Sequence, residues 1–422
     1  MDLEALEVAV RDAALAAGAE VLEKLLRDVG VGRREDKVRC SCGAIMESRG
    51  VKTKSIMTLL GQIRFGRSAY QCVRCAKVRH PGDEELDVVK TGYSPGVRRL
   101  TADFASDAPF KRVAHQLKAA AALQISRKDC ERIAEGVGED MGRWFDAERD
   151  RMRYAEPPPP QAEKSIETLY VEFDGTGVPM VPHEVAGRKG KQKDGSARTR
   201  EAKLGCVFTQ TTFDHKGRPI RDPSSTSFVG AIEEAEHFGW RIYAEAVRRG
   251  LYQARRIVII TDGAEWIRNI VQTHFKDATH VIDLYHAREH LVDLCKLLFE
   301  RDLRQLNQYK DQWWNDLDEG KIETIVEQAR AFLPKDPNAM KDARQHVGYF
   351  EKNKERMRYA DYFDQGLFVG SGVIEAGCKT LIGQRLKQSG MEWTVRGANA
   401  IAALRCVVQS GRFEDYWEQR AA

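Results

Sequence analysis

The amino-acid sequence predicts an α/β protein in which a mixed β-sheet carries helices on its faces. Three observations predict this class. Three strand-like segments lie close together after residue 165, a β-α-β pattern with a short, wholly apolar strand follows them, and long helical stretches precede and follow both. A short apolar run is typical of a buried parallel strand, and helices that alternate with strands are expected to cover the sheet.

The composition indicates a substantial hydrophobic core. The chain has 422 residues, of which 42% are hydrophobic and 31% are charged. We expect roughly two to three domains, and these proportions exclude a wholly disordered or a small disulfide-stapled protein. No uncharged apolar run approaches the roughly 18 residues of a membrane span, and the acidic start lacks the order of a signal peptide. We therefore expect the protein in the cytoplasm.

The first predicted element is an amphipathic helix over residues 3–29, for which Gly30 is a plausible C-terminal stop. We expect residues 1–35 to serve packing or dimerisation rather than catalysis. The apolar positions at helical spacing are Leu3, Leu6, Val10, Ala14, Ala17, Val21 and Leu25.

Four of the nine cysteines form two short-spaced pairs, Cys40-x-Cys42 and Cys72-x2-Cys75. Each tight turn can present two thiolates to one ion, which suits tetrahedral zinc. The residues between the pairs alternate like a β-hairpin, so residues 36–90 are predicted to form a zinc ribbon with a structural Zn²⁺. Two alternatives stay open, namely four ordinary thiols and a substitute ligand at His80. The odd number of cysteines argues against a complete disulfide framework.

Residues 91–156 are predicted to form a helix-turn-helix that binds DNA. Ser126 is a good N-cap for the last helix, with Asp129 three residues on. A helix, a short turn and a helix with basic side chains are typical of this motif, although any helical bundle gives the same pattern. The predicted helices span about 95–106, 109–122 and 127–152. The candidate DNA-binding residues are Arg127, Lys128 and Arg132.

The main domain boundary is predicted at residues 157–164, because the run Pro157–Pro160 cannot continue a helix and acts as a stiff spacer. Beyond it, residues 165–412 are expected to form one domain. From about residue 286 to 365 the pattern is helical, and a last helical region extends to about 405. The predicted strands are 168–174, 205–209, 225–229, 257–262 and 280–283, with a helix around 231–249.

Two aspartates share one setting, because Asp174 and Asp262 each end an apolar strand and precede a glycine. Carboxylates at the C-terminal ends of neighbouring strands point into the crevice where α/β sheets bind ligands. A third carboxylate, Glu375, lies in a Gly-Ser-Gly segment that opens a helix. Three such acids can hold two Mg²⁺ ions, which activate a water or a 3′-hydroxyl for attack on a phosphodiester. Taken singly, each acid is as readily explained as a turn former or a cap.

The net charge is only +4, but basic residues are concentrated in two blocks. Such blocks suggest contacts with a polyanion, and two solvated faces are the alternative explanation. The first block comprises Arg188, Lys189, Lys191, Lys193, Arg198, Arg200 and Lys203. The second comprises Lys379, Arg385, Lys387, Arg396, Arg405 and Arg412, of which the first three are candidate DNA contacts.

Several of these motifs occur together in a known family. Asp174, residues 260–267, the pair Asp283-x2-His286 and residues 371–375 resemble the DDE core of bacterial insertion-sequence transposases. The resemblance is to the ISKra-type group, which is related to the Mutator-like superfamily, and it spans about 165–410. The C-terminal signature of that group is similar to Arg385–Thr394, Gly397-Ala398 and Leu404-Arg405.

The resemblance implies an RNase H-like catalytic fold that uses Mg²⁺ or Mn²⁺ for DNA hydrolysis and strand transfer. Asp174, Asp262 and Glu375 match the three acids of the family. The long interval before Glu375 implies an inserted all-helical subdomain at about 296–365. The implied partner is double-stranded DNA of transposon ends and target, bound by a dimer or a higher oligomer in association with the nucleoid.

In that superfamily an aspartate or cysteine three residues before a histidine lies beside the active site, as Asp283 and His286 would here. We expect His286 to contact DNA or to orient an acid. A zinc pair with His290, or a merely structural pair, are the alternatives. One departure is that Phe368, Ser371 and Ile382 occupy the offsets where some DDE transposases have tyrosine, arginine and lysine. Lys379 and Arg385 could serve instead, but a hairpin-forming excision mechanism is not assumed.

The leading functional hypothesis is therefore a transposase. Two other classes compete with it. A structure-selective RNase H-like endonuclease would hydrolyse DNA without joining it, and a non-catalytic regulator would bind DNA through the zinc ribbon and the helix-turn-helix alone.

Overall fold

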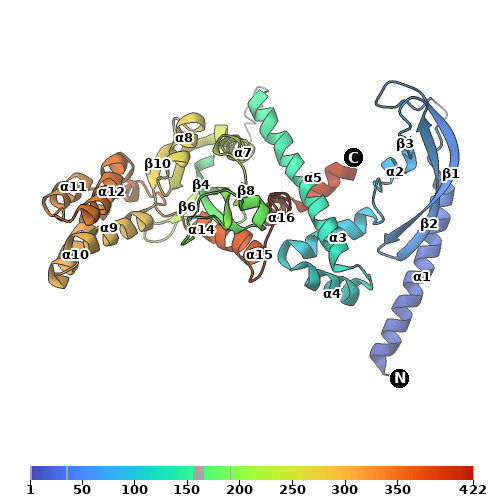
Figure 1. Cartoon of the computed structure of the whole chain (residues 1–422), viewed down its shortest axis with the longest axis horizontal. Coiled ribbons are helices and arrows are strands. Elements are labelled where there is room, and N and C mark those ends of the chain that lie inside the picture. The colour runs from blue at the N-terminus through green and yellow to red at the C-terminus, as the bar shows by residue number, and fades with distance from the viewer. Residues whose placement is uncertain (1, 35–36, 155–165, 191, 422) are drawn as a thin grey trace. The chain divides into compact units, whose positions relative to one another are not determined.

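The computed structural model describes residues 2–34, 37–154, 166–190 and 192–421, and the chain divides into two compact units, Met1–Val137 and Gly138–Ala422 (Figure 1). The division lies within the long helix α5 (Arg127–Tyr154), not at the predicted boundary. The predicted linker, residues 157–164, lies outside the described residues. The second half of α5 therefore belongs to the same unit as the larger β-sheet.

The first unit contains an antiparallel β-hairpin. Strands β1 (Met46–Thr58) and β2 (Gly61–Cys72) pair along nearly their whole length, and the short β3 (Val78–Arg79) lies beside β2. This arrangement confirms the hairpin predicted between the two cysteine pairs. Its buried cluster consists of Ile56, Ile63, Phe65 and Val88.

Helix α1 (Leu3–Val29) contacts this hairpin through the half-buried Ala19, Leu22 and Leu26. These residues lie on one helical face because they are three and four positions apart. The helix itself is confirmed, but the predicted apolar stripe is wrong. Its exposed members include Leu3, Leu6, Val10, Val21 and Leu25. The helix is rich in Ala, Leu and Val on several faces, so the spacing of apolar residues alone does not identify the face that the hairpin covers.

Three further helices follow the short α2 (Pro81–Glu85), close to the predicted ranges. They are α3 (Pro95–Asp107), α4 (Phe110–Ala121) and α5. The expected cap of α5 is present, because the Asp129 amide donates to Ser126 Oγ at 3.1 Å and this hydroxyl donates to the Asp129 carboxylate at 2.7 Å. Val113, Leu117 and Cys130 are fully buried between the helices. These features are common to a helix-turn-helix and to an ordinary helical bundle.

The second unit contains a five-stranded mixed sheet in the order β10-β9-β4-β5-β8. The central β4 pairs with β5 in antiparallel and with β9 in parallel orientation, while β8 is antiparallel to β5 and β10 is parallel to β9. The predicted mixed sheet is confirmed. The strands are β4 (Ile166–Pro179), β5 (Thr199–Gln210), β8 (Ser227–Ala231), β9 (Ala254–Thr261) and β10 (Thr279–Ile282), and a separate small sheet pairs β6 (Thr212–Phe213) with β7 (Pro219–Ile220).

Both faces of β4 are buried, and its side chains alternate between them. On one face, the ring of Phe173 lies 6.2 Å from Phe238 of α7 (Ala235–Arg248) and 6.1 Å from Trp266 of α8 (Glu265–His274). On the opposite face, Tyr170 packs edge-on against Phe368 at 5.3 Å. Helices α7 and α8 therefore cover one face of the sheet, and the C-terminal part of the chain covers the other.

All the described elements between β10 and residue 371 are helical, as predicted, although they begin earlier than residue 296. They are α9 (Leu284–Phe299), α10 (Leu303–Asp318), α11 (Ile322–Ala331), α12 (Pro337–Asn353), η2 (Lys354–Arg356) and α13 (Tyr359–Asp364). The indole of Trp313, which is fully buried, donates to Gln328 Oε1 at 2.6 Å within this helical part.

The remaining helices of the second unit include a π-helix, which often marks a functional site. It continues α14 (Gly372–Gly377), the helix that carries Glu375. The other short elements are α6 (Pro182–Val185) and η1 (Leu251–Gln253), and the C-terminal helices are α14, the π-helix η3 (Cys378–Gly383), α15 (Gln384–Leu386), α16 (Val395–Gln409) and α17 (Phe413–Ala421).

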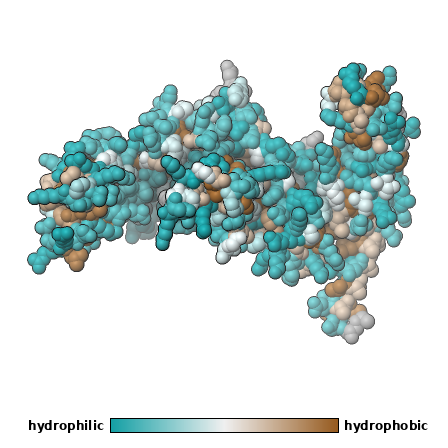
Figure 2. Space-filling view, viewed as in Figure 1, coloured by the Kyte–Doolittle hydropathy of each residue, from teal (hydrophilic) through white to brown (hydrophobic). Residues whose placement is uncertain are grey.

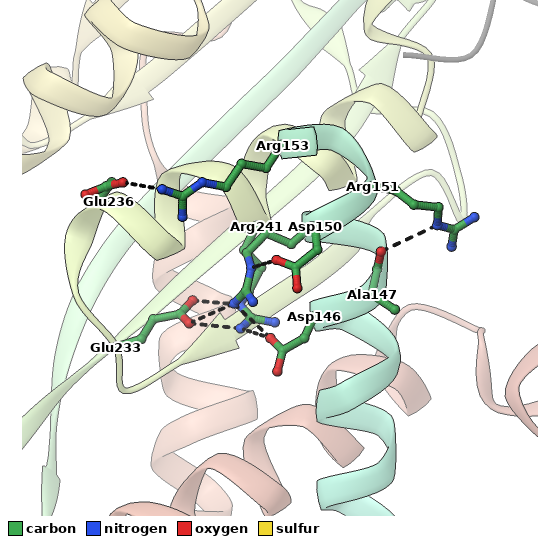
Figure 3. Close-up of polar contacts among 9 residues, drawn as sticks. Asp146, Ala147, Asp150, Arg151, Arg153, Glu233, Glu236 and Arg241 are labelled. Atoms are coloured by element: carbon green, nitrogen blue, oxygen red, sulfur yellow. Dashed lines mark hydrogen bonds and ion pairs between the residues drawn. The ribbon is translucent and has the colours of Figure 1, made fainter. Parts of the chain in front are cut away.

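The second half of α5 is bound to α7 by a nearly buried ion-pair network (Figure 3). The Arg241 guanidinium donates to Glu233 Oε1 at 2.6 Å and to Asp146 Oδ1 at 2.7 Å. Farther along α5, Arg153 donates to Glu236 at 2.9 Å. The neighbouring carboxylates raise the pKa of Arg241 despite its burial, so the group stays charged. These contacts explain why α5 divides between the two units rather than ending with the first.

Within the described residues, no helix is long and apolar enough to cross a membrane. The face of the molecule drawn in Figure 2 is mainly hydrophilic, with smaller apolar patches. Both observations agree with the sequence, in which 31% of the residues are charged.

Candidate active site

Asp174 and Asp262 lie on neighbouring strands of the five-stranded sheet, Asp174 within β4 and Asp262 directly after β9. In the parallel pair of β4 and β9, Glu172 is opposite Ile260, so the two aspartates follow at equivalent positions of neighbouring strands. Both are half-buried. The Gly175 amide donates to Asp174 Oδ1 at 2.6 Å, and the Ala264 amide donates to Asp262 Oδ1 at 2.9 Å. Asp262 directly follows β9, but β4 continues through Asp174 to Pro179 and stays paired with β5, so the predicted end of the strand at Asp174 is wrong. Asp174 instead lies where the pairing of β4 with β9 stops.

The pKa of Asp174 reflects its burial and the charged groups around it. Burial raises the pKa of Asp174 above its ordinary value, and the negative charges of Asp262 and Glu201 raise it further, whereas His286 lowers it. Like charges that meet in a partly buried place disfavour ionisation, and a metal ion reverses that effect.

A glycine follows each of the two aspartates, and the structure requires glycine at these two positions for different reasons. Gly263 has a φ of +89°, a backbone conformation that other residues rarely adopt. Gly175 lies so close to Glu201 that an added Cβ would be 2.4 Å from its Oε1. The glycines therefore allow a sharp turn after β9 and a close approach between β4 and β5.

Glu375 lies on the first turn of α14, which contacts β4. Cys378, one turn later, has its Sγ 3.9 Å from Asp174 Oδ2. The Glu375 side chain is 48% exposed, and its carboxylate accepts from Ser371 Oγ at 3.4 Å and lies 3.9 Å from Lys379 Nζ. The helix that carries Glu375 thus contacts Asp174 through Cys378, while the Glu375 carboxylate itself lies against Ser371 and Lys379.

Two buried acids bind the backbone around Glu375. Glu172 on β4 is fully buried, and its Oε2 accepts from the Ile374 amide at 2.9 Å. Burial raises the pKa of Glu172 to about 8. Asp283, 1% exposed, accepts from the Ser371 amide through Oδ2, and through Oδ1 from the His286 amide at the start of α9. Asp283 therefore links the beginning of α9 to the beginning of α14.

His286 is half exposed and close enough to Asp174 to influence its pKa. Its neighbour His290 stacks on Tyr349 with ring centroids 3.9 Å apart, and its Nδ1 lies 2.9 Å from Nδ1 of His346. These contacts favour the structural explanation of His290 over a zinc pair with His286. Tyr349 in turn donates to the Asp262 carbonyl at 3.2 Å, so the histidine cluster supports the end of β9.

The four predicted zinc ligands come together in the first unit. Cys40 and Cys75 have their sulfur atoms 3.5 Å apart, as do Cys42 and Cys72, and all four sulfurs lie within 4.8 Å of one another. Zinc with bonds of about 2.3 Å would place tetrahedral sulfurs about 3.8 Å apart. Four thiols in this arrangement therefore could bind zinc. His80, the possible substitute, instead has its Nδ1 3.2 Å from the Ser68 carbonyl.

Two of these thiols are already biased toward thiolate. The Cys42 amide lowers the pKa of Cys40 to about 6, and the amides of Cys75 and Arg74 lower the pKa of Cys72. Amide groups that point at sulfur favour its charged form, which is the form that binds zinc.

Among the residues that the structure describes, the cysteines are the only group of three or more thiol, imidazole or carboxylate side chains that meets this 4.8 Å criterion. Asp174, Asp262 and Glu375 do not meet it as their side chains stand. The carboxylate of Glu375 lies 3.4 Å from Ser371 Oγ and 3.9 Å from Lys379 Nζ.

The predicted basic residues divide into exposed and buried ones. Lys203 is 8% exposed, pairs with Glu201 at 3.0 Å and lies over the Trp266 ring, and Arg385 is fully buried over the Trp393 ring. Neither is available to DNA at the surface, which corrects the prediction for both. Lys191 lies outside the described residues. The exposed members are Arg127, Lys128, Arg132, Arg188, Lys189, Lys193, Arg198, Lys379 and Lys387, and Arg200 is partly exposed.

The comparison with known protein families gives a match along almost the whole chain. The sequence profile of an uncharacterised protein family, UPF0236, matches residues 1–420. The chain belongs to UPF0236. A curated relative, the UPF0236 protein in the vanSb 3′ region of Streptococcus gallolyticus, is 21% identical over 375 residues, which cover 87% of this chain and 75% of the relative.

A search of solved structures finds similarity to the Drosophila P element transposase strand transfer complex. The TM-score is 0.26 at 12% identity, over 81% of this chain and 85% of the other. A similarity this weak carries no argument about the fold or the function of the UPF0236 protein. The site must therefore be judged on its own residues.

Sequence reasoning missed Glu172 and Glu201 in this UPF0236 protein. Glu172 had a recognisable signal, because a single glutamate inside an apolar strand that is buried on both faces must have a specific partner. Glu201 had none, since its approach to Asp174 depends on the register of β4 with β5, in which Gly177 is opposite Glu201.

Proposed function

We propose that this protein is a DDE-type DNA transposase, similar to the ISKra-type group, that binds the ends of an insertion sequence and catalyses DNA hydrolysis and strand transfer. The observation that carries the proposal is that Asp174 and Asp262 lie at equivalent positions of β4 and β9, where the pairing of these strands stops, and that β4 there contacts α14, the helix that contains Glu375. Carboxylates that come together from neighbouring elements in this way are placed for metal-dependent chemistry.

The strand arrangement supports an RNase H-like catalytic fold for the second unit. Three antiparallel strands, β4, β5 and β8, are followed by β9 and β10, which run parallel to β4, and helices cover both faces. In this proposal, α9 to α13 form the helical subdomain inserted before Glu375.

The donor set of the site fits Mg²⁺ or Mn²⁺, which prefer carboxylate oxygens. Asp174 and Asp262 would hold the metal, and Glu375 would complete the set once its carboxylate turns away from Ser371 and Lys379. Bound metal would supply Lewis-acid activation of a water or a 3′-hydroxyl and neutralise charge on the phosphodiester. His286, whose charge acts on Asp174, would contact the DNA or orient that acid.

DNA recognition is assigned to the first unit and to the basic residues that are exposed. The four-cysteine group would form a zinc ribbon, and α3 to α5 would form a helix-turn-helix with Arg127, Lys128 and Arg132. In the second unit, the backbone of the DNA would follow the loop that precedes β5 and the side chains of Lys379 and Lys387. Phosphate contacts of this kind make the affinity strongly dependent on salt.

The test uses linear duplexes that carry the DNA flanking the gene on each side, incubated with the full-length protein and Mg²⁺. The proposal predicts cleavage at discrete positions and joining of the released 3′-hydroxyl end to target DNA. Asp174→Asn should abolish cleavage without changing binding in a mobility-shift assay. The control is Asp277→Asn, the same chemical change at an exposed position, which should retain cleavage.

Three other outcomes would favour an alternative function or change the set of catalytic residues. Cleavage without joining would favour the endonuclease, and specific binding without cleavage under Mg²⁺ or Mn²⁺ would favour the non-catalytic regulator. Cleavage that survives in Asp174→Asn would remove that acid from the site.

A further inference from the structure

We propose that Glu172 is a positioning residue that holds the first turn of α14, and with it Glu375, in place against the strand that carries Asp174. This inference rests on the proposed function, because it gives Glu172 a task only if Glu375 must reach the same metal as Asp174. Glu172 itself is not offered as a metal ligand.

The contact that carries the inference joins two of the three elements of the site. Glu172 lies two residues before Asp174, so both side chains project from the same face of β4. Its Oε2 accepts from the amide of Ile374, the residue next to Glu375, at 2.9 Å. The first amides of a helix have no partner within the helix. An acceptor on β4 therefore determines how the start of α14 sits on the strand.

Two other backbone amides, in the segment between α13 and α14, also donate to side chains of other elements. The Phe368 amide donates to Tyr170 Oη at 3.2 Å, and the Ser371 amide donates to Asp283 Oδ2. The three donating amides, those of Phe368, Ser371 and Ile374, are spaced three residues apart. Side chains from β4 and from the start of α9 thus align the returning chain, and Glu172 supplies the contact nearest to Glu375.

The burial of Glu172 argues against a role in packing alone. The side chain is fully buried, and within the described residues its Oε1 has no hydrogen-bond partner. Burying a carboxyl group with one oxygen unsatisfied is costly, whereas an apolar side chain of similar size would fill the space without that cost. The acceptor at Oε2 is what an apolar residue could not provide.

Small displacements at such a site have large effects on rate. Catalytic groups act at near-contact distances, and an error of about 1 Å can lower the rate about 100-fold. A loosened first turn of α14 would move Glu375 relative to Asp174 while leaving the DNA-binding surfaces unchanged.

The test compares Glu172→Gln, which keeps an acceptor oxygen for the Ile374 amide, with Glu172→Met, which removes the acceptor and keeps the volume. Mg²⁺-dependent cleavage and DNA affinity are measured for both. We expect Glu172→Met to cleave about 100-fold more slowly and to need more Mg²⁺ for half-maximal rate, at unchanged DNA affinity. Glu172→Gln should behave like the wild type. Glu167→Met, the same chemical change at an exposed position of the same strand, is the matched control and should keep both the cleavage rate and the Mg²⁺ requirement.

A second measurement separates failure of this inference from failure of the proposed function. Hydrogen–deuterium exchange of peptides covering residues 371–378 should be faster in Glu172→Met than in Glu172→Gln, whether or not the protein cleaves DNA. Equal exchange and equal Mg²⁺ requirement in the two variants would overturn the inference while wild-type cleavage stands. If the wild type cleaves no DNA, the proposed function falls and the positioning role falls with it, even where the exchange differs.

Discussion

Replacing Glu172 by Gln should change the stability of the protein in a way that depends on pH. Burial raises the pKa of this carboxyl from its ordinary value of 4.5 to about 8. The folded state therefore holds its proton more tightly than the unfolded state does between these values. Wild-type stability falls as the pH rises through this window, because unfolding allows the group to ionise. Glutamine does not titrate, so the variant lacks this loss.

The size of the effect follows from the pKa change. A rise from 4.5 to about 8 corresponds, at about 1.4 kcal/mol per pH unit, to at most about 5 kcal/mol. The contribution of Glu172 is fully present below pH 4.5 and lost above about 8. The substitution should also lower the free energy of unfolding by about 1–3 kcal/mol at every pH, because the amide NH₂ of Gln would take the place of the unpaired Oε1. The pH dependence is therefore the informative quantity.

The assay is urea denaturation of the wild type and Glu172→Gln at pH 5, 7 and 9, without added divalent metal. The free energy of unfolding of the variant, relative to the wild type, should increase from pH 5 to pH 9 by several kcal/mol. Glu167→Gln is the matched control, since Glu167 lies on the same strand with a 50% exposed side chain, and its difference should stay constant. A constant difference for Glu172→Gln would refute the burial argument.

Three further predictions concern the zinc group, the α5–α7 contact and the basic surface. Cys72→Ser should reduce bound zinc, measured by atomic absorption, from about one ion per chain to almost none. Cys130→Ala, which changes a buried thiol outside the group, should leave the bound zinc unchanged. Equal zinc content in the two variants would contradict the four-thiol site. Arg241→Met should lower the free energy of unfolding by about 1–3 kcal/mol in denaturant titrations, because it removes the hydrogen bonds of Arg241 to Glu233 and Asp146 and leaves Arg149 as their remaining cation. No measurable loss would show the contact to be unimportant. The double change Arg188→Gln, Lys189→Gln should flatten the slope of log affinity for DNA against log salt by up to about two, and an unchanged slope would remove these residues from the DNA path.

The sequence was sufficient for the elements whose signals are local. The strand ending at Asp262 is a short apolar run, and the hairpin lies between two cysteine pairs, so both were predicted correctly. The face of α1 could not be predicted, since it depends on the hairpin that covers Ala19, Leu22 and Leu26. Periodicity describes a helix by itself and does not identify its partner.

The candidate site was only partly predictable for the same reason. Asp174 and Asp262 follow from strand order, but the orientation of Glu375 toward Ser371 and Lys379 depends on side-chain contacts. Charge alone also placed Lys203 and Arg385 on a DNA surface, although tertiary contacts bury both. A formal charge in a sequence shows the type of a side chain and not its exposure.

The central claim is that Asp174, Asp262 and Glu375 share a metal site, and anomalous diffraction from crystals soaked in Mn²⁺ tests it most directly. We expect a Mn²⁺ peak about 2.0–2.3 Å from carboxylate oxygens of Asp174 and Asp262, with Glu375 turned toward it, and no peak there in Asp174→Asn. Mn²⁺ bound elsewhere, with these three carboxylates unliganded, would show that the acids do not form a metal site.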